Sequence, residues 1–153
     1  MRVLGVHCTA KYAFLSVAEG GLILELGASR LAAAQSTDAD AALWETLGSF
    51  EDALDEVNPD RIALLLPGTG PNAMGTHAAW APRVQLETLL RMAAAKRDIP
   101  VEQLARAAAL SRLNLPRKGK FELVVKPVVP ETGGYWMAGR LAAAAAALAV
   151  KDV

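Results

Sequence analysis

The sequence RVLGVHCT, residues 2–9, decides the fold of this chain. Val3 to Val6 form a short apolar run rich in β-branched residues, which is typical of a buried strand. Polar residues follow immediately, and the first of them is His7. We therefore predict that this segment is the central strand of an α/β sheet, with the imidazole of His7 at its end.

Two further apolar runs, residues 12–17 and 22–26, follow this strand. The sequence EGG between them, residues 19–21, is a strong hairpin signal because glycine adopts positive φ without steric cost. Three antiparallel strands should therefore open the fold. Residues 28–37 then form a polar connector that has room for a fourth, edge segment.

A helix is predicted over residues 38–57, where apolar residues recur at spacings of three and four. Residues 61–66 are then continuously apolar, as in a strand of a parallel sheet that is buried on both faces. A glycine-rich loop, residues 67–75, follows at the carboxyl end of that strand. This is the place where open α/β sheets bind ligands.

The second half of the chain predicts mainly helices. A long helix is expected over residues 80–97, and residues 98–113 contain either a short strand at 99–101 or a turn into a short helix. Residues 121–129 are expected to be an edge strand or an extended tail, because Pro127 cannot donate to a sheet. A final helix should run from Thr132 or Gly134 to about Val150, and its alanines should let it approach another element closely.

The composition indicates more apolar surface than one core requires. Hydrophobic residues make up 53% of the 153 residues, which we expect to form a single domain, 1–153. The longest apolar run, Leu141 to Val150, is too short to span a membrane. We therefore expect no membrane association, and we expect a homodimer that forms through the alanine-rich last helix and the helix around Trp80.

Charge and cysteine content narrow the function classes. Sixteen basic residues balance sixteen acidic ones, so the whole chain has no field that would steer it to nucleic acid, and such contacts must be local. The single cysteine, Cys8, cannot form an internal disulfide, and the N-terminus lacks the pattern of a signal peptide. We expect a cytoplasmic protein.

This order of elements resembles the ribonuclease H-like fold, and in detail its Holliday-junction resolvase, or RuvC-like, branch. Residues 3–7 with Thr9 resemble the first strand of that branch, which runs into an aspartate followed by a small glycine and threonine turn. Residues 61–66 resemble its fourth strand, 83–87 the start of its long helix, and 98–101 the short strand before its basic loop. The resemblance implies a mixed sheet of three antiparallel strands followed by parallel strands, flanked by helices.

The chain departs from this family at the acidic residues. The family places carboxylates at the end of the first strand, at the end of the fourth strand and in the last helix, where they hold two magnesium ions. Here these places hold His7, Leu66 or Pro67, and a helix without a carboxylate between Glu131 and Asp152. Magnesium requires oxygen ligands. The resemblance therefore implies a catalytically degenerate member, and we expect no catalytic residue, metal or cofactor.

Six residues are candidates for a cleft at the ends of the strands. His7 could act as a base or as a ligand for a softer metal, with His77 of the glycine-rich loop as partner, but we favour a buried histidine hydrogen-bonded to backbone. The loop could cradle a phosphate, although a plain strand-to-helix connection is the simpler interpretation. The full set of cleft candidates is His7, Thr9, Gly68, Thr69, Asn72 and His77.

Four basic residues form the local concentration of positive charge that this neutral chain offers: Arg112, Arg117, Lys118 and Lys120. They could contact nucleic-acid phosphates, with Phe121, Tyr135 or Trp136 available to stack on an unpaired base. The alternative is an ordinary solvated loop. The resemblance favours contact, because the resolvase branch has a basic loop near this position.

Our leading hypothesis is a catalytically degenerate RuvC-like domain that acts by binding or as a scaffold and associates with nucleic acid. One alternative is a metal-dependent nuclease with a non-standard site around His7, which recruits Glu87, Glu122 or Glu131. Another alternative is a protein-interaction subunit without a nucleic-acid role. Neutralising Arg117, Lys118 and Lys120 distinguishes the first hypothesis from the last.

Overall fold

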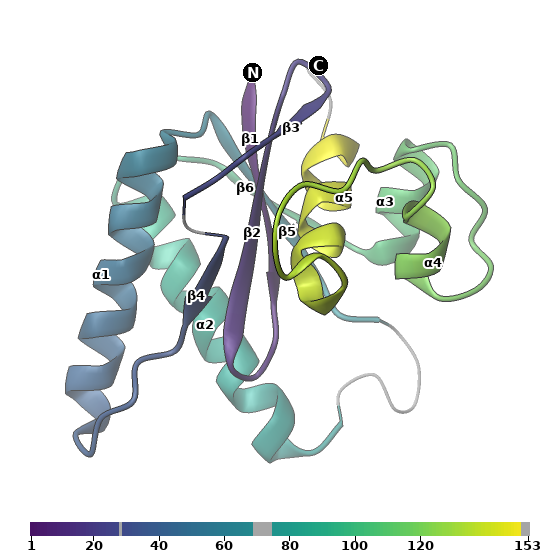
Figure 1. Cartoon of the computed structure of the whole chain (residues 1–153). Coiled ribbons are helices and arrows are strands. Elements are labelled where there is room, and N and C mark those ends of the chain that lie inside the picture. Colours follow the sequence, from purple (N-terminus) through teal and green to yellow (C-terminus); the bar gives the residue numbers. More distant parts are fainter. Residues whose placement is uncertain (28, 69–74, 151–153) are drawn as a thin grey trace.

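A six-stranded mixed sheet lies between two layers of helices in the computed structural model, which describes residues 1–27, 29–68 and 75–150 (Figure 1). The strands are β1 (Arg2–Cys8), β2 (Tyr12–Glu19), β3 (Leu22–Leu24), β4 (Arg30–Ala32), β5 (Arg61–Leu65) and β6 (Val101–Leu104). The helices are α1 (Ala39–Val57), α2 (His77–Ala95), α3 (Arg106–Arg112), α4 (Phe121–Val125), the π-helical η1 (Trp136–Arg140) and α5 (Leu141–Ala149). The α/β class is confirmed.

The first strand is central, as predicted. The sheet order is β3-β2-β1-β5-β6, and β4 pairs with β2. β1 pairs antiparallel with β2 and parallel with β5, and β5 pairs parallel with β6. The three opening strands are therefore antiparallel and the later ones parallel, and β4 forms the fourth segment for which residues 28–37 had room.

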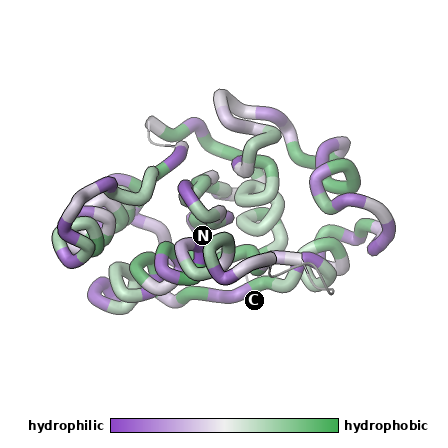
Figure 2. The backbone as a smooth tube through the Cα atoms, turned by 90° about the horizontal axis from the view of Figure 1, so that it is seen from below, coloured by the Kyte–Doolittle hydropathy of each residue, from purple (hydrophilic) through white to green (hydrophobic). Residues whose placement is uncertain are grey.

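One face of the sheet is covered by α1 and α2. Residues of even number on β1, such as Leu4 and Val6, belong to a buried cluster with Phe50 of α1 and Leu90 of α2. The carboxylate of Asp38 caps α1, since its Oδ1 accepts hydrogen bonds from two backbone N–H groups of the first turn. Helices on both sides of the sheet carry hydrophilic and hydrophobic positions next to each other in Figure 2, as expected when one side of a helix is buried.

The other face is covered by α5, with α3 and α4 beside it (Figure 1). The alanines of α5 let its backbone lie directly on the strand, as predicted: a Cβ atom added at Gly5 would overlap the carbonyl oxygen of Ala143. Residues 141–147 are at most 1% exposed. The prediction that this helix forms a dimer interface is therefore wrong, because the sheet of the same chain already covers it.

Three element predictions need correction. Residues 121–125 form a helix, not an edge strand, and they bury Phe121 and Val125, which lie four residues apart on one helix face. The short strand lies at Val101–Leu104 rather than at 99–101. The final α-helix begins at Leu141, after a π-helical turn, because the backbone at Gly139 departs from helical geometry.

The helix around Trp80 begins three residues earlier than predicted, at His77, and it contains Pro82. His77 therefore lies on α2 and not in the glycine-rich loop. Among the described residues, no helix combines the length and the apolar character that a membrane crossing requires.

Candidate functional site

The carboxyl ends of β1, β5 and β6 meet at one edge of the sheet, which is the lower edge in Figure 1. The register pairs His7 with Leu65 and Leu65 with Leu104. Residues paired in this way point to the same face of a sheet. Leu65 and Leu104 belong to the cluster under α3, α4 and α5, so His7 also points to this face.

His7 lies largely buried at this edge. Its Nδ1 has no hydrogen-bond partner among the described residues, so this atom does not make the backbone hydrogen bond that we expected. Burial and, to a smaller extent, the positive charge of Arg106 together lower the pKa of His7 to about 4, against the raising effect of Glu122. The imidazole is therefore neutral at neutral pH.

Arg106 lies close to the carboxyl end of β6, because it begins α3 only two residues after Leu104. Its Nη1 lies 3.4 Å from Oε1 of Glu122, and its guanidinium lies over the ring of Phe121 at 5.3 Å from the centroid. Its buried Nε has no hydrogen-bond partner in the described part of the chain. One ion pair therefore leaves part of its donor capacity unused.

An open pocket of about 400 Å³ lies beside Arg106. Its lining brings together Gly68 after β5, the start of α3 and the segment before α4: Gly68, Arg106, Ala107, Leu110, Arg117, Gly119, Lys120, Phe121 and Glu122. Three cations and one carboxylate give this lining a net positive charge. An anion with several oxygens fits such a lining better than a metal ion does.

The four predicted basic residues divide into two groups. Arg117 and Lys120 line the pocket, and Lys118 lies exposed between them. Arg112 points elsewhere, because its Nη1 lies 2.6 Å from Oε1 of Glu102. Its charge is therefore already compensated within the protein.

The other cleft candidates do not gather around His7. Thr9 stabilises the turn between β1 and β2, where its Oγ1 accepts hydrogen bonds from the backbone N–H groups of Lys11 and Tyr12. His77 is exposed on α2 and meets the ring of Trp80 edge-on, with 4.9 Å between centroids. Gly68 lines the pocket, whereas Thr69 and Asn72 lie outside the described residues.

The carboxylates proposed for a non-standard metal site are engaged elsewhere. Glu87 pairs with Arg83 at 3.4 Å on α2, beside Cys8, which points to the face opposite His7. Burial raises the pKa of Glu87. Glu131 is exposed, and Glu122 pairs with Arg106. Within residues 1–27, 29–68 and 75–150, no three side chains of His, Cys, Asp or Glu come together, so the donor set at this edge does not fit magnesium.

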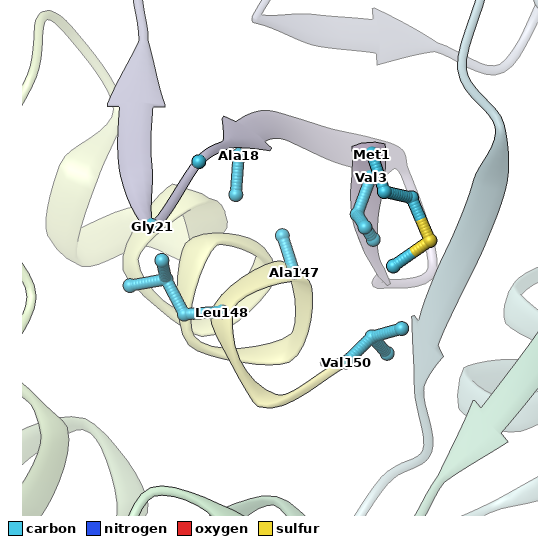
Figure 3. Close-up of a pocket in the computed structure, with 8 residues that line it drawn as sticks. Met1, Val3, Ala18, Gly21, Ala147, Leu148 and Val150 are labelled. Carbon is cyan, nitrogen blue, oxygen red and sulfur yellow. The ribbon is translucent and has the colours of Figure 1, made fainter. Parts of the chain in front are cut away.

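A second hollow, of about 290 Å³, lies at the opposite edge of the sheet (Figure 3). Val3, Ala18, Ala147 and Leu148 are among the residues that line it, and the N-terminal residue Met1 also lies there. None of the described lining residues has a charged side chain, so this hollow offers fewer groups for a charged ligand than the basic pocket beside Arg106 does. The edge that carries His7 is the better candidate.

Sequence reasoning missed Arg106 and an aromatic group around Arg30. The guanidinium of Arg30 lies 4.1 Å from the ring centroid of Tyr12 and 4.0 Å from that of Tyr135. These three residues are far apart in the sequence, so no local pattern could have revealed the group. Arg106 had a weak signal, since it is the first charged residue after the strand β6.

Neither a protein-family model nor a curated protein matches this sequence. Solved structures do match. RuvC of Thermus thermophilus, in complex with a Holliday junction substrate, is 15% identical, with a TM-score of 0.71 over 97% of this chain and 91% of that chain. A further structure of Thermus thermophilus RuvC gives 15% identity and a TM-score of 0.70 over 97% and 92%. The yeast mitochondrial Holliday junction resolvase Ydc2 gives 13% and 0.55 over 96% and 77%. The predicted RuvC-like fold is confirmed.

Proposed function

We propose that this chain uses a RuvC-like fold to bind nucleic acid through the basic pocket at the carboxyl edge of its sheet, without cleaving it by a two-metal mechanism. One observation carries the proposal: Arg106, two residues after the end of β6, puts a positive charge near enough to His7 to lower its pKa, at the edge where two-metal chemistry requires carboxylates. A fixed positive charge there repels a metal ion and attracts a phosphate.

The charge of the pocket supports a phosphodiester as the ligand group. Arg106, Arg117 and Lys120 converge on it from two segments, and Glu122 is the one carboxylate among the described residues of the lining. The whole chain is neutral, so binding depends on these local contacts and not on a long-range field. Because RuvC of similar fold was solved with a Holliday junction, a four-way DNA junction is the first ligand to test.

In this proposal His7 is a neutral, largely buried side chain. Its burial and the positive charge of Arg106 both oppose a protonated form. It therefore neither binds phosphate as a cation nor completes a carboxylate set. Its contribution is to fill the end of β1 beneath the pocket-forming helices.

Fluorescence anisotropy with a labelled four-way junction tests the proposal. The double variant Arg117→Gln, Lys120→Gln should bind more weakly and show a salt slope reduced by about 2, because two phosphate contacts are lost. Arg112→Gln is the matched control, since this arginine lies in the same region but is not among the described residues that line the pocket. Equal affinity for the double variant and wild type would favour the protein-interaction alternative.

A cleavage assay on the same junction tests the second half of the proposal. Wild type is expected to leave the junction intact with Mg²⁺ and with Mn²⁺. Metal-dependent cleavage that disappears in His7→Ala would contradict the proposal and support the nuclease alternative. An active control resolvase shows that the substrate can be cut.

The predicted homodimer is retained as a proposal, now with α2 as its interface. Trp80, Val84, Thr88 and Met92 recur every four residues along this helix, and Val84 and Met92 are 39% and 48% exposed. Such a stripe is self-complementary when two copies of the helix cross around a two-fold axis. It provides an apolar contact surface that the buried α5 cannot provide.

A further inference from the structure

The guanidinium of Arg30 contacts two tyrosine rings. Its Cζ atom is 4.1 Å from the centroid of Tyr12 and 4.0 Å from that of Tyr135. Both distances are well within the range of cation–π contacts. The three side chains come from β2, from β4 and from the segment before η1, so the tertiary fold assembles this group, which we call the arginine stack.

Strand pairing and a buried arginine hold the arginine stack in place. β4 pairs with β2 so that Arg30 lies opposite Phe14. Nη1 of Arg140 donates to the carbonyl oxygens of Thr132 and Gly134, in the segment just before Tyr135. Arg140 is only 2% exposed, and its Nε donates to the carbonyl oxygen of Leu15 on β2. The backbone that carries Tyr135 is thereby tied to the same strand that carries Tyr12.

Arg30 makes no ion pair among the described residues, unlike Arg97, whose Nε and Nη2 donate to the carboxylate of Asp55. The cation–π contacts to the two rings do not use the N–H groups of the guanidinium as hydrogen-bond donors. These N–H groups can bind an oxyanion with two parallel hydrogen bonds. Because the contacts to the rings already restrict the side chain, binding orders it less than it would order a free arginine.

The arginine stack and the basic pocket lie at the same edge and on the same face of the sheet. The cross-strand register connects them: Arg30 pairs with Phe14, Phe14 with His7, His7 with Leu65 and Leu65 with Leu104. Four strand spacings separate β4 from β6, which amounts to about 19 Å. Arg106 follows Leu104 directly after the end of β6. A ligand that contacts both places must therefore extend across most of the sheet.

We propose that Arg30, held by Tyr12 and Tyr135, is a second phosphate-binding point for the same nucleic-acid strand or junction arm that occupies the basic pocket. This inference rests on the proposed function and goes beyond it, because it predicts a minimum ligand length. A duplex arm carries phosphates throughout a span of about 19 Å. A dinucleotide is too short to bridge this distance.

Anisotropy with two probes tests the length requirement: a four-way junction with arms about one helical turn long, and a 5′-phosphorylated dinucleotide that competes for the basic pocket. Arg30→Gln should weaken junction binding about tenfold and reduce the salt slope by about 1, because one charge-assisted contact is lost. The affinity of the dinucleotide should not change. Arg30→Lys should lose an intermediate amount, since it keeps the charge but loses the planar fork.

Variants of Tyr135 test the role of the stack. Tyr135→Phe keeps a ring and should bind the junction like wild type. Tyr135→Leu should weaken binding less than Arg30→Gln does, because the guanidinium remains but is held less firmly. Circular dichroism of each variant verifies that it folds. A purely structural tyrosine would change thermal stability without changing the salt slope.

Three results would overturn the inference. One is an unchanged junction affinity of Arg30→Gln when the double variant Arg117→Gln, Lys120→Gln binds more weakly. That result would leave the proposed function intact. Another is an equal loss for the junction and for the dinucleotide. A wild-type protein that binds neither probe would refute the proposed function itself, and the inference with it.

Discussion

Replacing His7 with glutamine should change how the stability of this protein depends on pH. In the folded protein the pKa of His7 is about 4, below its ordinary value of 6.5, because the imidazole is buried and faces Arg106. The unfolded chain therefore binds more protons than the folded one between these two values. The free energy of unfolding that His7 contributes is fully present above pH 6.5 and is lost as the pH falls towards 4.

The size of this effect follows from the shift. Each pKa unit corresponds to about 1.4 kcal/mol, so the full difference amounts to about 3 kcal/mol, as an upper value. Other groups titrate in the same range. Glu51 and Asp55 have pKa values lowered by hydrogen bonds from Lys96 and Arg97, and they also lose their contribution on the acid side. Glu87, whose pKa burial raises, works in the opposite direction, because its contribution is lost as the pH rises.

Urea denaturation followed by circular dichroism at a series of pH values isolates the contribution of His7. The difference between wild type and His7→Gln should decrease by up to about 3 kcal/mol from pH 7 to pH 4, because the other titrating groups occur in both proteins. His77→Gln, which removes the exposed histidine of α2, is the matched control. A difference that stays constant over this range, or that increases towards low pH, would refute the argument that burial keeps His7 neutral.

Two further predictions concern packing and assembly. In urea denaturation, Gly5→Ala should lower the free energy of unfolding by about 3 kcal/mol or more, because the added Cβ atom would overlap the backbone of α5. Gly48→Ala is the control, since a Cβ atom added there would have no heavy atom within 4 Å. It should raise the free energy of unfolding by about 0.5–1 kcal/mol. A stable Gly5→Ala protein would contradict the direct contact between β1 and α5. Met92→Lys on α2 should convert the proposed dimer to a monomer in sedimentation equilibrium. Leu123→Lys on α4 is the control and should leave the dimer intact. A monomeric wild-type protein would refute the proposed interface.

The sequence predicted the sheet because its signals are local. The apolar runs of β1, β2 and β5 and the glycines at 20 and 21 each report on a few neighbouring residues, and the glycines do adopt positive φ. The short run from Phe121 to Val125 was assigned wrongly for a related reason. Four apolar residues and one glutamate fit a strand and a buried helix turn equally well, and only packing against α5 decides between them.

The candidate site was less predictable because it depends on contacts between distant segments. Arg117, Lys118 and Lys120 were recognised from their local density, and two of them line the pocket. Arg106 and the arginine stack become visible only when strand register and helix starts are known. The alanine-rich helix illustrates the same limit, since composition predicts a close contact but does not say whether the partner is the same chain or another.

The position of α5 also has a consequence for protein synthesis. This helix covers the face of β1 and β2, and Ser16 donates a hydrogen bond to the carbonyl of Arg140, 124 residues later. While the ribosome makes the intervening chain, α1 and α2 can already cover one face of the sheet, but the other face has no helix to cover it. Long-range contacts of this kind slow folding and leave apolar strands exposed in the nascent chain. Residues such as Val3 and Leu65 therefore lack their packing partners from α5 until that helix has left the ribosome.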